Sequence, residues 1–166
     1  MEVSRRHPLA ERDLKEVLSA IERDFGVDLS PVLSGDIVEV AYIKRSEDVE
    51  RLLLKDGKVQ AFLTEGRWYP SLHALLELGE PGDHFVKIDM GAVKPVASGA
   101  DVMAPGIVEA GEVSEGDGVV VIDERHGRPL AVGVALMDGE EMVEKGKGRA
   151  VRNVHHVGDA IWEARF

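Results

Sequence analysis

The chain has 166 residues, with 20 lysines and arginines against 31 aspartates and glutamates, for a net charge of −11. It contains no cysteine, which excludes disulfide-stapled secreted modules, iron–sulfur clusters, thiolate zinc sites and cysteine nucleophiles. Apolar residues make up 44%, enough for the core of one domain or of two small ones. The N-terminus lacks the apolar run of a signal peptide, and no stretch approaches membrane-spanning length. We therefore expect a soluble, cytoplasmic protein that does not contact membranes.

The first third of the chain predicts a helix followed by a strand. The helix is expected from about Pro8 to Asp24, because apolar residues recur at helical spacing and Gly26 follows as a C-cap. β-Branched and aromatic residues then predict a strand near Ile37–Ile43.

The next segment predicts a hairpin and a second helix. The pair Asp56-Gly57 stands between two apolar runs, which is a strong hairpin signal. Ser71 as N-cap and Gly79 as the stop bound a helix with the sequence LHALLEL. Together these elements predict that the first half of the chain is a mixed α+β unit.

A turn-forming cluster at residues 80–83 is the best candidate for a domain boundary. After it, short strands rich in glycine are expected in VKIDMG, DVMAPGIV, GDGVVVIDE, RPLAVGVALMD and RAVRNVHHV. AVKPVASGA is expected to be a short helix or turn, and DGEEMVEK a short helix. Strands this short and this often interrupted by turns predict a small closed or nearly closed barrel.

No sequence pattern nominates a catalytic or metal site. Neither Ser98 nor Ser114 lies in a nucleophile elbow, and Gly146-Lys147-Gly148 departs from the phosphate loop at its first glycine and its hydroxyl position. His155 and His156 are adjacent, so on a strand they would point to opposite faces, which is a poor geometry for chelating one metal. Asp89 is interpreted as a structural hydrogen-bond acceptor at the turn near Gly91. We therefore expect no catalytic residues, no metal and no cofactor.

Charge is unevenly distributed despite the acidic total, which by itself disfavours a nucleic-acid partner. Lys145, Lys147, Arg149 and Arg152 fall within eight residues that contain no acid. On a strand, Arg149 and Arg152 would face opposite sides, because they are an odd number of residues apart. The glycines beside Lys147 leave backbone N–H groups open to a phosphate. This stretch is interpreted either as a solvated surface or as a local contact for RNA.

Three segments, IDMGAVKPVASGADVMAPGI, PLAVGVALM and GKGRAVRNVHHVGDAIW, together resemble the PUA domain over about residues 85–164. RRHPLAERDLKEV and WYPSLHALL resemble the N-terminal domain of archaeal PUA proteins, in the malignant T-cell-amplified sequence family and the corresponding part of the ligatin-type translation factor. The resemblance implies an α+β fold, with a pre-PUA domain at residues 1–84 followed by a PUA β pseudobarrel at residues 85–166.

The resemblance also implies a function and a binding surface. It implies a translation-associated RNA-binding protein without catalysis, which recognises the 3′ CCA end of tRNA or small-subunit ribosomal RNA. The expected partners are RNA, the small ribosomal subunit and an initiation-factor-like protein in trans. Carried onto matching positions, the expected RNA contacts are Gly91, Ala92, Lys94, Gly99, Ala100, Asp101, Met103, Pro105, Gly106, Lys147, Gly148, Arg149, Ala150 and Arg152.

The residue types are compatible with that role, and each has a structural alternative. The lysines and arginines suit phosphates, the glycine turns expose backbone, and Met103 could offer an apolar face to a base. Alternatively, the glycines only shape tight turns and Met103 belongs to the core. A second hypothesis is a protein-interaction adaptor that uses the acidic first half, with Trp68, Tyr69 and Leu72 as candidate contacts.

Overall fold

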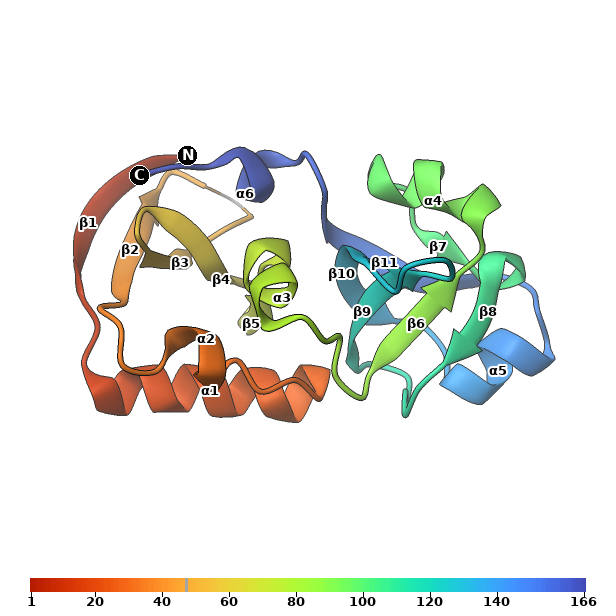
Figure 1. Ribbon diagram of the computed structural model, residues 1–166. Helices are drawn as coiled ribbons and strands as arrows, with labels where there is room; N and C mark the ends of the chain where they lie inside the picture. Colours follow the sequence, from red (N-terminus) through yellow and green to blue (C-terminus); the bar gives the residue numbers. More distant parts are fainter. Residues whose placement is uncertain (47) are drawn as a thin grey trace.

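Two sheets, each with its own helices, form two lobes that lie side by side (Figure 1). The computed structural model describes residues 1–46 and 48–166. The first lobe is an antiparallel sheet in the order β1-β2-β3-β4-β5 together with helices α1–α3. Its elements are β1 (Glu2–Pro8), α1 (Glu11–Phe25), α2 (Ser30–Leu33), β2 (Glu39–Lys44), β3 (Arg51–Lys55), β4 (Lys58–Thr64), β5 (Arg67–Pro70) and α3 (Leu72–Leu78).

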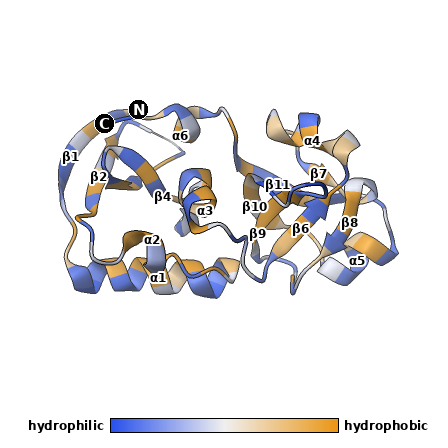
Figure 2. Cartoon of the chain, viewed as in Figure 1, coloured by the Kyte–Doolittle hydropathy of each residue, from blue (hydrophilic) through white to orange (hydrophobic). Residues whose placement is uncertain are grey.

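The turn and helix-capping residues of the first lobe act as predicted. The backbones of Asp56 and Gly57 are both left-handed (φ 52° and 77°), as a tight two-residue hairpin between β3 and β4 requires. The Ser71 side chain accepts a hydrogen bond from the N–H of Ala74 and so caps α3. Helix α1 is amphipathic (Figure 2) and buries five apolar side chains against the sheet, namely Leu14, Val17, Leu18, Ile21 and Phe25.

The N-terminal boundary differs from the prediction. Pro8 does not begin a helix but ends strand β1, which pairs antiparallel with β2, and α1 begins three residues later at Glu11. Proline is tolerated there because β1 is an edge strand, where a missing N–H does not interrupt a central ladder. The second strand is also displaced, since β2 begins at Glu39 and Ile37 is 78% exposed.

The second lobe is a six-stranded sheet in the order β7-β11-β10-β9-β6-β8, which curls into a nearly closed pseudobarrel. All neighbouring strands are antiparallel except β6 and β9. Its elements are β6 (Phe85–Ile88), α4 (Met90–Ala97), β7 (Val102–Met103), the 3-10 turn η1 (Ala104–Gly106), β8 (Ile107–Ala110), β9 (Gly118–Asp123), β10 (Pro129–Ala135), α5 (Gly139–Glu144) and β11 (Arg149–His156). The segment DVMAPGIV, predicted as one strand, is therefore divided by η1 into β7 and β8.

Strand β9 contributes side chains to the cores of both lobes. Val119 and Val121 belong to the core of the pseudobarrel, whereas Val120 and Ile122 belong to the core of the first lobe. Because successive side chains of a strand point to opposite faces, the run VVVI covers both cores. All six residues of β9 are accordingly buried.

The end of the chain returns to the first lobe. After β11, the short helix α6 (Ala160–Glu163) places Trp162 against His73, with ring centroids 4.2 Å apart. The N–H of Phe166 then donates to the carbonyl of Gly57 at the tip of the β3–β4 hairpin. No helix in the described part of the chain is long and apolar enough to cross a membrane.

Candidate nucleic-acid interface

Pairing between β7 and β11 brings together the segments that the sequence singled out. Met103 lies opposite Arg149, and Val102 lies opposite Val151. The N–H of Ala104 donates to the carbonyl of Gly148 over 2.8 Å, which extends the connection into η1. Residues about 45 positions apart in the sequence therefore form one surface, made of α4, the α4–β7 turn, η1 and the beginning of β11. We call this the α4–β11 surface.

Asn153, which the sequence analysis did not single out, holds the α4–β7 turn against β11. Its Nδ2 donates to the carbonyls of Val96 and Ala100, at 3.0 and 2.9 Å. Its backbone N–H donates to Oδ1 of Asp101 at 2.9 Å. In the sequence, the only signal of this role is that Asn153 is an asparagine, with two amide donors, within an expected strand.

Two of the nominated glycines have structural reasons to be glycine. Gly99 has a φ of +103°, and a Cβ there would lie 2.9 Å from Nε2 of His156. A Cβ on Gly106 would lie 3.0 Å from the Cβ of Ala92. Both glycines thus permit close approach of chain segments, which is the structural alternative raised for them above.

The four nominated basic residues differ in their partners. Nε of Arg149 lies 3.1 Å from Oδ2 of Asp101, itself a nominated residue, and Nη2 of Arg152 lies 3.2 Å from Oε2 of Glu65 in the first lobe. Within the described part of the chain, Lys94 and Lys147 make no ion pair. The two lysines are therefore the cations whose charge is least compensated.

Exposure separates the nominated residues further. Met103 is 48% exposed, so it is a surface residue and not a core residue. Ala150 is fully buried, backbone included, so it is not accessible to a ligand on this surface. The exposed members of the set are Gly91, Lys94, Ala100, Met103, Pro105, Lys147, Gly148 and Arg149, whereas Ala92, Gly99, Asp101, Gly106 and Arg152 are partly buried.

Asp89 is a structural residue, as predicted. Its side chain caps the N-terminus of α4 by accepting a hydrogen bond from the N–H of Ala92, at 2.9 Å. At the same end of the helix, the N–H of Met90 donates a hydrogen bond to Oε1 of Glu124. The cap fixes where α4 begins and so where Lys94 stands on the surface.

The two adjacent histidines face opposite sides of β11, as predicted. His155 is fully buried; its Nδ1 lies 2.9 Å from the carboxylate of Asp159, and its Nε2 accepts a hydrogen bond from the N–H of Leu72. Burial lowers the pKa of His155, and the hydrogen bond to Asp159 only partly opposes this. Burial tends to raise the pKa of Asp159, but hydrogen bonds from His155 and from backbone N–H groups outweigh it and lower the pKa. Through the hydrogen bond to Leu72, this pair links β11 to the first lobe.

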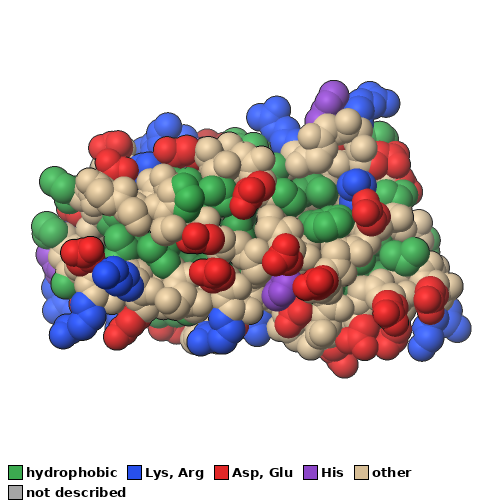
Figure 3. Space-filling view, turned by 60° about the horizontal axis from the view of Figure 1, so that its bottom comes forward, with side chains coloured by type: hydrophobic (Ala, Val, Ile, Leu, Met, Phe, Trp, Pro, Cys, Tyr) green, Lys and Arg blue, Asp and Glu red, His purple; other side chains and the backbone are tan. Residues whose placement is uncertain are grey.

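Acidic side chains outnumber basic ones in the chain by 31 to 20. Figure 3 shows mainly acidic side chains on the face that carries α5. With a net charge of −11, most of the surface repels phosphate. A polyanion is therefore favoured only where basic side chains are left without acidic partners.

The candidates for an adaptor surface lie mostly in the core. Tyr69 is 2% exposed and Leu72 is fully buried, and only Trp68 of the three is partly exposed. The ring of Tyr69 stacks on Phe62, with centroids 5.3 Å apart. These residues do not form an exposed apolar patch.

The fold and the α4–β11 surface define a PUA-domain protein with an α+β domain before the pseudobarrel. Residues 84–157 match the family model of the PUA domain, and residues 5–78 match a domain of unknown function, DUF1947. PUA domains are RNA-binding modules. The fold class predicted from the sequence is confirmed.

Relatives extend the match over the whole chain. An uncharacterized protein of Methanocaldococcus jannaschii is 42% identical over 98% of both chains. Translation machinery-associated protein 20 of Saccharomyces cerevisiae is 34% identical, covering 71% of this chain and 68% of its own. The malignant T-cell-amplified sequence 1 homolog of Drosophila melanogaster is 32% identical, covering 74% and 70%. The chain belongs to the family that contains these PUA-domain proteins.

Solved structures agree with this assignment. A hypothetical protein from the archaeon Pyrococcus horikoshii superposes with a TM-score of 0.80 at 38% identity, covering 96% of this chain and 98% of its own. A conserved PUA domain protein from Thermoplasma acidophilum superposes with a TM-score of 0.78 at 28% identity, covering 95% and 97%. The arrangement of both lobes is thus shared with solved relatives.

Proposed function

We propose that this protein binds RNA through the α4–β11 surface and acts in translation. The observation that carries the proposal is the pairing of β7 with β11, which sets exposed Met103 opposite Arg149 and brings the Gly148 backbone to η1. This combination offers bare backbone, one soft apolar side chain and nearby cations within a few residues. Lys94 and Lys147 would contact phosphates, and Met103 would contact a base.

We further propose that the RNA is the 3′ CCA end of a tRNA or a segment of small-subunit ribosomal RNA. Sequence-selective RNA recognition targets unpaired nucleotides, whose bases can pack against exposed backbone and apolar side chains. The α4–β11 surface offers few cations on a chain of net charge −11, which suits a single-stranded end better than a long duplex. Its basic groups are too few for tight binding along many phosphates.

The role that fits these features is recognition without catalysis, in the cytoplasm. The small ribosomal subunit and an initiation-factor-like protein in trans are the proposed partners, and the name of the yeast relative, translation machinery-associated protein 20, supports a role in translation. We also propose that residues 1–84 and 85–166 are the two domains of the chain. The separate sheets support that division, although residues 160–166 pack on the first lobe.

Crosslinking of the protein to total RNA of its source cell, followed by sequencing of the bound fragments, tests the proposal. We expect enrichment of tRNA 3′ ends or of one region of small-subunit ribosomal RNA. The double variant Lys94→Ala/Lys147→Ala should lose that enrichment. Fragments drawn at random from the RNA pool, or an unchanged profile in the double variant, would contradict the proposal.

A further inference from the structure

One row of side chains crosses the whole sheet of the first lobe. Arg5 lies opposite Tyr42, Tyr42 opposite Arg51, Arg51 opposite Leu63, and Leu63 opposite Trp68, so all five strands contribute. Directly opposed residues of neighbouring strands point to the same face of a sheet. The row thus presents two arginines and two aromatic rings on one face of the first lobe.

The two arginines of this row both lie over the ring of Tyr42. The guanidinium carbons of Arg5 and Arg51 lie 4.0 and 4.8 Å from the centroid of the Tyr42 ring. Both side chains are exposed, and within the residues that the structure describes neither makes an ion pair. By contrast Arg6, the neighbour of Arg5, is paired with Glu39 at 2.9 Å. The row therefore concentrates uncompensated positive charge on an acidic protein.

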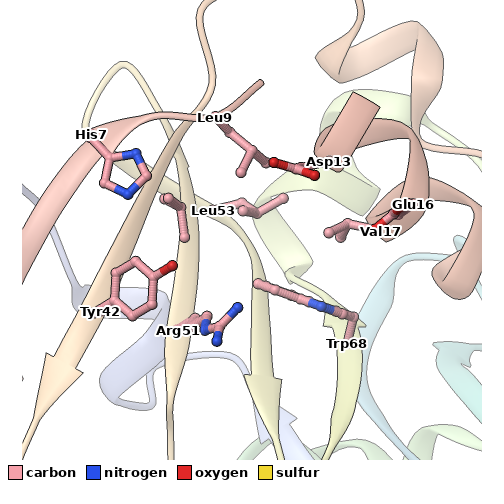
Figure 4. A pocket seen from close by; sticks show the side chains of 10 residues that line it. His7, Leu9, Asp13, Glu16, Val17, Tyr42, Arg51, Leu53 and Trp68 are labelled. Carbon is pink, nitrogen blue, oxygen red and sulfur yellow. The ribbon is translucent and has the colours of Figure 1, made fainter. Parts of the chain in front are cut away.

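Beside the row lies a cavity between the sheet and α1, with a volume of about 360 Å³ (Figure 4). Tyr42, Arg51 and Trp68 line it from the sheet, while Asp13 and Glu16 line it from the helix. Such a volume is at the lower end of the range of about 300–1,000 Å³ for small-molecule pockets. It suits one planar group and is too small for a folded segment of a partner protein.

The lining selects the chemistry of the occupant. An acidic group would be repelled by Asp13 and Glu16, and a cationic group by Arg51. A nucleobase is neutral, has two flat faces for Trp68 and the Arg51 guanidinium, and has an edge with both donors and acceptors. Its donors can bind the carboxylates and its acceptors the guanidinium. The phosphate of the same nucleotide would be placed outside the cavity, against Arg5 and Arg51.

We propose that this cavity binds an unpaired base of an RNA strand, so that the first lobe makes a second RNA contact. The inference rests on the proposed function, because it assumes RNA as the ligand, but it involves a different lobe and different residues. Stacking of single bases on aromatic side chains tolerates any sequence, since every base has a π-face. The first lobe would then add affinity for unpaired strands, and the α4–β11 surface would supply selectivity.

The test is binding of the full chain to hexauridylate and hexaadenylate RNA, with an RNA duplex of similar length for comparison. We expect the single strands to bind better than the duplex, and Arg51→Ala to weaken their binding by about tenfold, within the range for loss of one stacked base. Arg51→Lys keeps the charge but not the planar group, and should weaken binding several-fold. Arg6→Ala is the control, because it removes the same charge from the same sheet at a residue outside the row, where Arg6 is ion-paired with Glu39; it should change affinity by less than twofold.

A fluorescence readout locates the contact. The chain has two tryptophans, so Trp162→Phe leaves Trp68 as the only one, and the single strands should quench its emission. Unfolding by urea shows whether each variant remains folded. Equal loss of affinity in Arg51→Ala and Arg6→Ala, or failure of the oligomers to bind the wild-type chain or to change Trp68 emission, would overturn the proposal.

The same set of variants separates this proposal from the proposed function. If Lys94→Ala/Lys147→Ala lowers affinity for cellular RNA while Arg51→Ala changes nothing, the α4–β11 surface stands and the cavity proposal is wrong. If Arg51→Ala lowers affinity for single strands while the lysine variant changes nothing, the cavity proposal stands and the α4–β11 surface is wrong.

Discussion

The backbone N–H of Leu72 donates a hydrogen bond to Nε2 of His155 over 3.1 Å, and this bond crosses from the first lobe to the second. Because Nε2 accepts, the proton of the neutral ring is on Nδ1, which lies 2.9 Å from the Asp159 carboxylate. Asp159 also accepts hydrogen bonds from the N–H groups of His156 and Trp162. The Gly-Asp-x-x-Trp sequence that follows β11 thus helps to join the two lobes.

This geometry predicts that acid weakens the fold. Burial holds the pKa of His155 below its ordinary value of 6.5, so the folded protein keeps the ring neutral. In the unfolded chain the ring binds a proton as pH falls below about 6.5, so the unfolded state binds more protons and the free energy of unfolding decreases. The lowered pKa of Asp159 adds a second loss as pH falls below about 3.8. The nearby His73 and His156 also lower the pKa of His155 and so disfavour its protonation.

Urea unfolding at pH 8, 6.5 and 5.5 measures this effect. We expect the free energy of unfolding to fall by no more than about 1.4 kcal/mol per pH unit from this one group. His155→Phe should be less stable than wild type at pH 8 and should show a flatter pH dependence between pH 6.5 and 5.5. The exposed His126 provides a control, since His126→Phe should retain the wild-type slope. An unchanged slope in His155→Phe would refute the assignment.

The unpaired lysines of the α4–β11 surface should govern the salt dependence of RNA binding. Each phosphate contact to a single strand contributes a slope of about −0.7 to log K against log salt. We expect Lys94→Ala and Lys147→Ala each to weaken RNA binding and to make this slope less negative by roughly 0.7. Binding measured at several salt concentrations gives both quantities. Lys15→Ala, on the outer face of α1, should alter neither; an equal effect of Lys15→Ala would show that the response reflects total charge alone.

Gly99 should be intolerant of any side chain. Gly99→Ala combines a left-handed backbone with a Cβ that would lie 2.9 Å from Nε2 of His156. Gly116 is a matched control, since its φ is +93° and a Cβ there meets nothing within 4 Å. We expect Gly116→Ala to cost about 1 kcal/mol and Gly99→Ala roughly twice that or more. Thermal or urea unfolding of the two variants compares these costs. Equal losses would mean that His156 moves away freely.

Local signals predicted much of the first lobe, because caps and tight turns depend on neighbouring residues alone. The Asp56-Gly57 hairpin and the Ser71 cap are where the sequence places them. Strand β1 was missed because its residues are charged or polar and only Val3 is even partly buried. Its strand conformation comes from pairing with β2, a contact between residues more than 30 positions apart.

The partners of the basic residues could not be predicted either. Arg149 and Arg152 do reach different carboxylates, in keeping with their odd spacing. However, a register shift between Arg149 and Val151 places both Ala150 and Val151 in the core, so simple alternation along β11 fails. The contact of Arg152 with Glu65 depends on how the lobes pack, which no local pattern contains.

Arg152 was expected to bind RNA, and its ion pair with Glu65 gives a sharp test of that role. The side chains of Arg152 and Glu65 are 39% and 69% exposed, so we expect a coupling energy of no more than about 1 kcal/mol in a double-mutant cycle of stability. If Arg152 only joins the lobes, Arg152→Ala and Glu65→Ala lower stability similarly and neither changes RNA affinity beyond twofold. If Arg152 binds phosphate, Arg152→Ala weakens RNA binding and Glu65→Ala strengthens it, because the guanidinium is released. We expect the first result, since Lys94 and Lys147 already provide cations that no described carboxylate neutralises.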